Sequence, residues 1–371
     1  MLDRPVWAEI DLGAIAQNIA NFRKLIGTAP RLCAVVKADG YGHGAPQVAR
    51  AALDAGADWL AVALVAEAAE LRRAGFLGPI LVLGCPSPDQ AREAALLDLR
   101  MTVVSPEHAR AFSEAGEALG RRVKVHLKVD SGMGRIGTRF DEAPGAAAAV
   151  AAMRGLELEG AYTHFAGADS EDLSYAKVQL ERFMDALEGI EARGLRLAVR
   201  HASNSAATMC MPEARLDMVR PGIAVYGLAP SAETKLAFPL APAMRLRARV
   251  AAAKELAAGE PVSYGMTWRA PSTRVIATLP LGYADGYPRL LSSRGWVGIR
   301  GAKAPIAGRV CMDMCMADAT GTGAAPGDEV DVYGGSGPSL DEVAALVGTI
   351  NYEVACAVGK RVPRRYVGAS R

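Results

Sequence analysis

Short apolar runs alternate with longer amphipathic, alanine-rich stretches over the first 219 residues of the chain. Apolar runs of about four to eight residues bounded by polar turns are typical of buried strands, and longer amphipathic stretches are typical of helices. The pattern predicts a leading strand over residues 7–12, a helix over 13–25 and then eight further strands. These eight strands are expected over 32–36, 59–64, 80–83, 101–104, 123–129, 158–164, 197–201 and 216–219.

Eight buried strands, each separated from the next by room for a helix, favour an α/β fold in which a parallel sheet closes as a (β/α)8 barrel of the TIM type. An open doubly wound sheet shows the same alternation, and the strand count alone does not exclude it. The alanine-rich stretch 143–152 is interpreted as a crossover helix, because alanine is the best helix former.

The alternation breaks down at residues 230–242, where three prolines and scattered polar residues resemble a linker. Beyond it, β-rich runs are punctuated by glycine and proline. We therefore expect a barrel over residues 1–235 and a predominantly β C-terminal domain over 236–371, which the leading strand 7–12 can join. The expected elements of the second domain are strands over 262–268, 274–279, 296–299 and 329–333, a helix over 340–347 and a final segment over 351–366.

Composition and charge narrow the class of protein. A chain of 371 residues with 51% hydrophobic composition can bury one or two cores. Its 42 basic and 40 acidic residues form no long block of one sign, so we expect small-molecule partners and neither nucleic acid nor membrane. The acidic N-terminus does not resemble a secretory peptide, and six cysteines without a regular framework suit a reducing compartment, so a cytoplasmic location is expected. Cys311 and Cys315 lack the further ligands of a metal site, and no metal is expected.

Polar residues stand where several of the predicted strands end. A (β/α)8 barrel builds its active site at the carboxyl ends of its strands. Each such residue alone has an ordinary structural explanation, such as a solvated lysine or a hydrogen-bonded histidine, but their agreement favours a shared site. The residues are Lys37 after the first strand, Lys128 and Asp130 at the fifth, His164 at the sixth, His201, Asn204 and Ser205 at the seventh, and Arg220 at the eighth.

This set favours amine chemistry with a phosphate-bearing cofactor. A lysine among cationic neighbours can lose its proton and condense with an aldehyde to form a Schiff base, a role available to Lys37. Glycines at 40, 42 and 44 let the backbone approach a bulky ligand. Phosphate is bound by backbone N–H groups and hydroxyls. The candidates for phosphate are Tyr41, Ser205, Gly222 and Ile223.

Gly132, Gly134 and Gly137 form a G-x-G-x-x-G pattern directly after a predicted strand, which is also the dinucleotide-binding fingerprint. Here the pattern follows the fifth strand, and no acidic residue clearly ends the next strand about 20 residues on. We therefore favour a loop that presents Arg135 to a carboxylate, for which a planar guanidinium is suited.

Segments along the whole chain resemble the alanine racemase family. The most specific is the block from Val35 to Gly44 around Lys37, which is similar to the family's cofactor-lysine signature; the family more often has alanine where Gly40 stands, a departure expected only to loosen the loop. The matches reach Tyr352 and so cover both expected domains. Supporting blocks lie at 127–137, 162–166, 204–206, 219–223, 263–265 and 308–314.

The resemblance implies a homodimer that binds pyridoxal 5'-phosphate and interconverts L-alanine and D-alanine at sites shared between subunits. Lys37 would carry the cofactor and act on the D-enantiomer, while Tyr264 from the partner subunit would take the α-proton of the L-enantiomer. The reaction would supply D-alanine for the cell wall or consume it. The resemblance also implies that His164 and Arg220, supported by His201, would link the tyrosine to the pyridine nitrogen, that Arg135 and Met312 would bind substrate, and that Tyr283 would narrow the entrance and Asp313 orient the site. Lys128 would be carbamylated to hold Arg135, unless Asp130 or Asn204 does so. The residues that would bind the cofactor are Tyr41, Asn204, Ser205, Gly222, Ile223 and Tyr352.

Two alternatives stay open at this point. Amino-acid decarboxylases of related fold use a carboxylate at the pyridine nitrogen as part of a strong electron sink, whereas Arg220 does not usefully give up its proton. A carrier that binds pyridoxal phosphate without turnover would keep the lysine but have no use for Tyr264 or a second domain.

Overall fold

A computed structural model describes residues 4–368 of the chain. Two compact units are present, and each is described by itself. Within the described residues, the larger unit comprises 15–40 and 45–241, and the smaller unit comprises 4–14, 41–44 and 242–368.

The larger unit is built on eight parallel strands with one short extra strand beside them. Their order is β10-β2-β3-β4-β5-β6-β8-β9, and backbone bonds of 3.0 Å from Asp217 to Arg200 and from Arg220 to Ser203 bring the first and last strands together. The sheet is therefore a nearly closed barrel, as predicted, and the open-sheet alternative is wrong. The strands are β2 (Arg31–Val35), β3 (Trp59–Val62), β4 (Ile80–Val82), β5 (Arg100–Val103), β6 (Val123–Asp130), β7 (Thr138–Arg139), β8 (Leu156–Tyr162), β9 (Val199–His201) and β10 (Met218–Val219).

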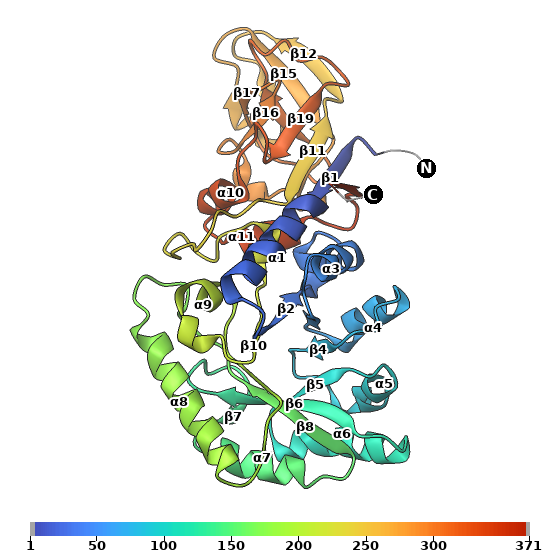
Figure 1. The fold of residues 1–371 in the computed structure, drawn as a ribbon. Coiled ribbons are helices and arrows are strands. Elements are labelled where there is room, and N and C mark those ends of the chain that lie inside the picture. The colour runs from blue at the N-terminus through green and yellow to red at the C-terminus, as the bar shows by residue number, and fades with distance from the viewer. Residues whose placement is uncertain (1–3, 369–371) are drawn as a thin grey trace. The chain divides into compact units, whose positions relative to one another are not determined.

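Helices follow the barrel strands and lie on the outside of the barrel (Figure 1). The longest, α8, buries Leu180, Phe183, Leu187 and Ile190, a spacing that places apolar side chains on one helix face. The alanine-rich stretch is helix α7, as predicted. The helices are α1 (Leu12–Ile26), α3 (Ala45–Asp54), α4 (Val65–Arg73), α5 (Ala91–Leu96), α6 (Pro106–Ala118), α7 (Ala143–Ala151), α8 (Ser174–Glu191) and α9 (Ser205–Cys210), with short 3-10 helices η1 (Pro88–Gln90), η2 (Pro212–Ala214) and η3 (Ile223–Tyr226).

The smaller unit is mostly antiparallel sheet. Its main sheet has the order β17-β16-β19-β11-β1-β20, in which the leading strand β1 pairs antiparallel with β11 and parallel with β20. A second sheet has the order β12-β15-β18. The elements are β1 (Val6–Asp11), β11 (Met244–Arg249), β12 (Ala252–Leu256), β13 (Pro261–Val262), β14 (Trp268–Arg269), β15 (Arg274–Leu279), β16 (Trp296–Ile299), β17 (Ala302–Pro305), β18 (Cys315–Asp318), β19 (Glu329–Tyr333), β20 (Arg364–Val367), α10 (Leu340–Val347), α11 (Asn351–Ala357), η4 (Tyr264–Met266), η5 (Tyr283–Asp285) and η6 (Arg289–Leu291).

One expected strand of this unit is wrong. The run 262–268 is not continuous, because β13 and β14 form a hairpin around the turn η4. Ser263, Gly265 and Met266 adopt positive φ angles of 67°, 73° and 50°, which end strand pairing on both sides of Tyr264. The hairpin still packs through Val262 and Trp268 into an apolar cluster, which explains the apolar sequence pattern.

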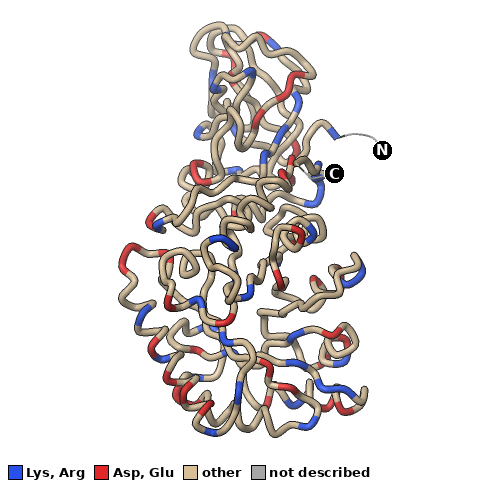
Figure 2. Tube along the Cα trace, in the orientation of Figure 1, with Lys and Arg blue, Asp and Glu red and all other residues tan. Residues whose placement is uncertain are grey.

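Basic and acidic residues are interspersed along both units (Figure 2). Within residues 4–368, no helix is long and apolar enough to cross a membrane.

Candidate active site

The segment after β2 has an unusual backbone. In the segment α2 (Lys37–Tyr41), Ala38, Asp39, Gly40 and Tyr41 all have positive φ angles of 51° to 61°, which makes a left-handed turn. Left-handed helical conformation costs about 1–2 kcal/mol for each non-glycine residue. The turn is therefore held by specific bonds: Asp39 accepts the N–H of Ala45 at 2.8 Å, and the Glu67 carboxylate accepts that of Ala38 at 2.6 Å.

Gly42, in the smaller unit, lies against helix α11. A Cβ atom at this position would lie 2.4 Å from the carbonyl oxygen of Ala355, so only glycine fits. Arg364 donates to the Gly42 carbonyl from Nε at 3.0 Å and from Nη2 at 2.8 Å. The same arrangement brings the rings of Tyr41 and Tyr352 to a centroid distance of 6.2 Å. Two of the predicted cofactor-binding residues are therefore close together.

Arg220 follows β10 and is buried inside the barrel. Its guanidinium donates from Nη1 to His201 Nδ1 at 2.8 Å, and from Nη2 to the carbonyls of Thr163 and Ala202, both at 2.9 Å. These bonds use three of the five N–H groups of a guanidinium and leave two for a bound group. Burial lowers the pKa of Arg220 to about 10, so the group stays charged near neutral pH.

Tyr162 organises the cations at this end of the barrel. Its ring stacks on His201 at a centroid distance of 4.8 Å, and Arg220 and Lys128 lie over the ring at 5.2 and 5.4 Å. Burial, together with the charges of Arg220 and Arg135, lowers the pKa of Lys128 to about 7. A neutral amine therefore exists at Lys128 near physiological pH.

His164, which follows β8, is surrounded by positive charge. Burial, then the charges of Arg220, Arg135, Lys128 and Lys37, lowers the pKa of His164 well below its usual value. The imidazole is thus neutral at physiological pH. The barrel residues predicted from the strand ends therefore act on one another electrostatically, as a shared site requires.

Ser205 and Gly222 are brought together after β9 and β10. The Ser205 hydroxyl accepts the N–H of Gly222 at 2.8 Å, and Gly222 directly precedes η3, which begins at Ile223. Ser205 in turn begins helix α9, which Asn204 caps by accepting the N–H of Ala207 at 2.9 Å. N-terminal N–H groups of such turns favour anions such as phosphate. Capping gives Asn204 a structural role beside the predicted contact with the cofactor.

The glycine-rich loop after β6 is shaped by Asp130, whose carboxylate accepts the N–H groups of Gly132, Met133 and Gly134 at 2.9–3.1 Å. A Cβ at Gly137 would lie 2.8 Å from the Lys128 carbonyl, so this glycine lets the loop return over β6. The loop leads into β7, not directly into a helix as the dinucleotide fingerprint requires, and it leaves Arg135 exposed.

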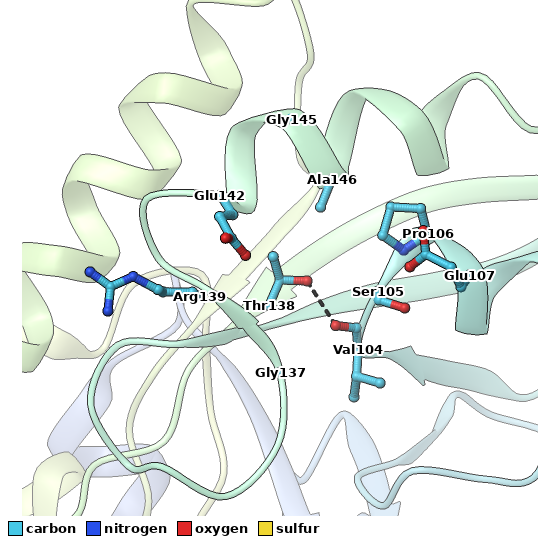
Figure 3. Close-up of a pocket in the computed structure, with 10 residues that line it drawn as sticks. All are labelled: Val104, Ser105, Pro106, Glu107, Gly137, Thr138, Arg139, Glu142, Gly145 and Ala146. Carbon is cyan, nitrogen blue, oxygen red and sulfur yellow. Dashed lines mark hydrogen bonds between the residues drawn. The ribbon is translucent and has the colours of Figure 1, made fainter.

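A cavity of about 480 Å³ opens beside this loop, between the start of α6 and α7 (Figure 3). In it Thr138 donates a hydrogen bond of 2.8 Å to the carbonyl of Val104, while Arg139 points away from the other labelled residues. None of the predicted site residues lines this cavity.

The smaller unit joins the two loops that carry Tyr283 and Met312. Tyr283 N–H donates to the Cys311 carbonyl and Ala284 N–H to the Met312 carbonyl, both at 3.0 Å. A Cβ at Gly282 would lie 2.2 Å from the Cys311 oxygen, so the close approach of the loops requires glycine there. Tyr283 and Met312 are therefore held on one surface.

An arginine that the sequence analysis missed ties Asp313 to these loops. Arg361 pairs with Asp313 at 2.7 Å and with the buried Asp285 at 3.5 Å, and Asp285 also pairs with Arg4 at 2.7 Å. No local pattern signals this link, because Arg361 and Asp313 lie far apart in sequence.

Tyr264 stands on the turn η4 and is 73% exposed. Ser263, which precedes it with a positive φ, donates its hydroxyl hydrogen to the Arg309 carbonyl at 2.6 Å and so fixes the strained turn. Met266 and Met312 are also exposed, at 57% and 54%. Tyr264, Met266 and Met312 are therefore three large side chains that the smaller unit leaves exposed.

Comparisons with known proteins agree along the whole chain. Models of the alanine racemase N-terminal domain and C-terminal domain match residues 10–230 and 243–366. The alanine racemase of Desulforamulus reducens is 51% identical over 99% of this chain and 100% of its own length. The chain belongs to the alanine racemase family.

Solved alanine racemase structures share the fold. The Clostridium difficile enzyme matches with a TM-score of 0.96 and 37% identity over 99% of this chain and 97% of that one. The Bacillus anthracis alanine racemase, solved with bound L-Ala-P, matches with a TM-score of 0.94 and 39% identity over 100% and 97%. The predicted family, its class as an amino-acid racemase among the isomerases, and the barrel followed by a β domain are thereby confirmed.

Sequence reasoning also missed Tyr162 and Thr163, which contact Arg220, and the buried pair His126 and Glu159, which share a hydrogen bond of 3.0 Å. His126 precedes Lys128 by two residues in β6, so both side chains point to the same face of the strand. That period-two relation to a predicted site residue was the available signal.

Proposed function

We propose that this alanine racemase family member interconverts L-alanine and D-alanine with pyridoxal 5'-phosphate held covalently on Lys37. The observation that carries the proposal is the buried, charged Arg220, fixed by three hydrogen bonds with two N–H groups left. Its position among the barrel residues supports an arginine donor, and not a carboxylate, at the pyridine nitrogen.

The described residues fit such a cofactor. Ser205, Gly222 and Ile223 offer a hydroxyl and two adjacent helix N-termini for a phosphate, and Tyr41 with Tyr352 offers two phenols. When bound, the cofactor delocalises the electron pair that remains when the Cα proton leaves. Arg220 donates hydrogen bonds without giving up its proton, which limits that delocalisation and favours return of the proton to Cα.

Inversion at Cα needs a proton donor or acceptor on each face. We assign these roles to Lys37 for the D-enantiomer and to Tyr264 for the L-enantiomer. Tyr264 is largely exposed, which supports a homodimer in which this residue completes the site of the partner subunit. A carrier protein would have no need of this exposed tyrosine.

Arg135 binds the substrate carboxylate in this proposal, and Met312 contributes a backbone contact. Lys128, with its pKa lowered to about 7, has a neutral amine whose nitrogen can bond to the carbon of carbon dioxide and release a proton to solvent. The resulting carbamate would be an anion suited to hold Arg135. Tyr283 and Asp313, held together by the loops and by Arg361, narrow and orient the entrance.

Two variants test the assignment in the purified protein. Lys37→Ala should abolish covalent attachment of the cofactor, seen as loss of its bound absorbance band. Tyr264→Phe should keep the cofactor attached and lower conversion of L-alanine by two orders of magnitude or more, because general acid–base catalysis contributes about 10²–10⁴-fold. Equal and mild effects of both substitutions would overturn the two-base proposal.

A further inference from the structure

A line of buried polar side chains runs through the barrel from Arg220, at the carboxyl ends of the strands, toward their amino ends. Arg220 Nη1 lies 2.8 Å from His201 Nδ1, His201 Nε2 lies 2.8 Å from His126 Nδ1, and His126 Nε2 lies 3.0 Å from Glu159 Oε2. Both imidazoles are fully buried, and Glu159 is 8% exposed. The line is therefore continuous and shielded from water.

The direction of every hydrogen bond in this line is fixed by its two ends. A guanidinium can only donate, so His201 Nδ1 must accept and the hydrogen of His201 must be on Nε2. That hydrogen is donated to His126 Nδ1, which leaves the hydrogen of His126 on Nε2. A carboxylate can only accept, and Glu159 takes this last hydrogen. One pair of tautomers satisfies all three bonds.

Charge and burial support these neutral tautomers. Burial lowers the pKa of His126, and burial with the charge of Arg220 lowers that of His201 well below its usual value. For Glu159, burial acts to raise the pKa, but the hydrogen bond from His126 and the charges of Arg100 and Lys124 outweigh it, so the pKa is lowered.

Glu159 is anchored at the amino ends of the strands. Arg100, the first residue of β5, lies 3.5 Å from its carboxylate, and Lys124 of β6 lies 3.3 Å from it. The neighbouring Gly160 allows both the backbone of β9 and the imidazole to come close, because a Cβ there would lie 2.3 Å from the Val199 carbonyl oxygen and 2.8 Å from His126 Nδ1. The positive charges of Arg100 and Lys124 thus hold the Glu159 carboxylate, and the lack of a side chain at Gly160 leaves room for the His126 imidazole.

We infer that His126 and Glu159 are positioning residues for Arg220, acting through His201. The carboxylate fixes the tautomer of His126, and His126 in turn fixes the tautomer of His201. His201 Nδ1 therefore always presents an acceptor to the guanidinium of Arg220. The inference rests on the proposed function, in which Arg220 contacts the cofactor. Without the carboxylate, His126 is free to carry its hydrogen on Nδ1 and to donate it to His201 Nε2. The hydrogen of His201 then moves to Nδ1, where it faces the N–H of Arg220, and Arg220 loses its acceptor.

The test compares Glu159→Gln with Glu159→Leu in the cofactor-loaded full-length protein labelled with ¹⁵N-histidine. Glutamine keeps an oxygen that can accept from His126, whereas leucine has similar size and no acceptor. The chain contains five histidines, so the imidazole signals can be assigned by single substitutions. Ile190→Val, in the buried face of α8, is the control for a modest loss of stability.

In the wild type and Glu159→Gln, the hydrogen between His201 Nε2 and His126 Nδ1 should reside on His201 Nε2, seen as one-bond ¹⁵N–¹H coupling at that nitrogen and scalar coupling across to His126 Nδ1. Glu159→Leu should lose the one-bond coupling at His201 Nε2, because the hydrogen moves to His126 Nδ1. The same variant should lower kcat for both enantiomers by about tenfold, with KM changed less than about threefold, as expected for one lost hydrogen bond at Arg220. Glu159→Gln and Ile190→Val should keep kcat within about threefold of the wild type.

Three results would overturn the inference: no coupling in the wild type, a hydrogen that stays on His201 Nε2 in Glu159→Leu, or a hydrogen that leaves this nitrogen there with kcat unchanged. Failure of the proposed function is distinguishable, because a wild type that does not racemise alanine would still report the histidine coupling.

Discussion

Substitution of Gly42 by alanine tests how the segment that follows Lys37 is anchored. The added methyl group would lie 2.4 Å from the Ala355 carbonyl oxygen, and Gly42 has a φ of 81°. The segment cannot simply withdraw, because Arg364 binds the Gly42 carbonyl with two hydrogen bonds. Gly27→Ala is a matched control, since Gly27 has a φ of 72° and open space where the Cβ would lie.

The two substitutions share one energetic cost and differ in the other. Placing alanine at positive φ costs about 1–2 kcal/mol, and this is the whole expected effect at Gly27. Overpacking against a fixed backbone adds about 1–3 kcal/mol, so Gly42→Ala should lose about 2–5 kcal/mol of unfolding free energy. The displaced segment also carries Tyr41, which we propose as a phosphate ligand, and loss of one hydrogen bond to a charged phosphate weakens binding by about tenfold or more.

The assay is urea unfolding of the two variants and the wild type without cofactor, followed by titration with pyridoxal 5'-phosphate monitored by absorbance. Gly42→Ala should unfold at clearly lower urea than Gly27→Ala and bind the cofactor more weakly, whereas Gly27→Ala should bind it like the wild type. Equal destabilisation by the two alanines, with unchanged cofactor binding, would refute the anchoring argument.

Three further predictions concern charged groups. In bicarbonate-free buffer between about pH 7 and 10.5, Lys128 is protonated in the unfolded chain but has released its proton in the folded chain, because its pKa falls from the ordinary 10.5 to about 7 on folding. The unfolding free energy should therefore rise with pH in this window relative to that of Lys128→Met, by at most about 1.4 kcal/mol per pH unit. Parallel curves would contradict the lowered pKa. With ¹³C-bicarbonate, the wild type and a control Lys254→Met should show a carbamate carbon signal by NMR that Lys128→Met lacks; a signal that persists in Lys128→Met would place the carbamate elsewhere. Asp285→Asn should lower the unfolding free energy measured in urea by about 1–3 kcal/mol, because it weakens the ion pairs of this buried carboxylate with the partly exposed Arg4 and Arg361. An unchanged urea midpoint would show that these pairs contribute nothing to stability.

The barrel could be predicted because its determinants are local. Each buried strand is a short apolar run, and each active-site residue follows such a run, so Lys37, His164 and Arg220 could be assigned to one end of the barrel from their sequence positions. Helix α7 was equally predictable from its alanine content. The high helix propensity of alanine outweighs the lack of separate polar and apolar faces along this helix.

What the sequence did not reveal depends on contacts between distant residues or on unusual backbone angles. The turn that carries Tyr264 was read as strand because Val262 and Trp268 are apolar, and nothing local indicates that Ser263 and Met266 take positive φ angles. His126 and Glu159 are 33 residues apart in sequence, and it is the parallel pairing of β6 with β8 that brings them within hydrogen-bond distance.

The central claim is that this chain removes and returns the Cα proton of alanine on both faces. Its most direct measurement is incubation of the cofactor-loaded protein with L-alanine in deuterated water, followed by chiral separation and mass analysis of the product. The account predicts D-alanine that carries deuterium at Cα. Bound cofactor with neither D-alanine nor deuterated alanine formed would contradict it and favour a carrier.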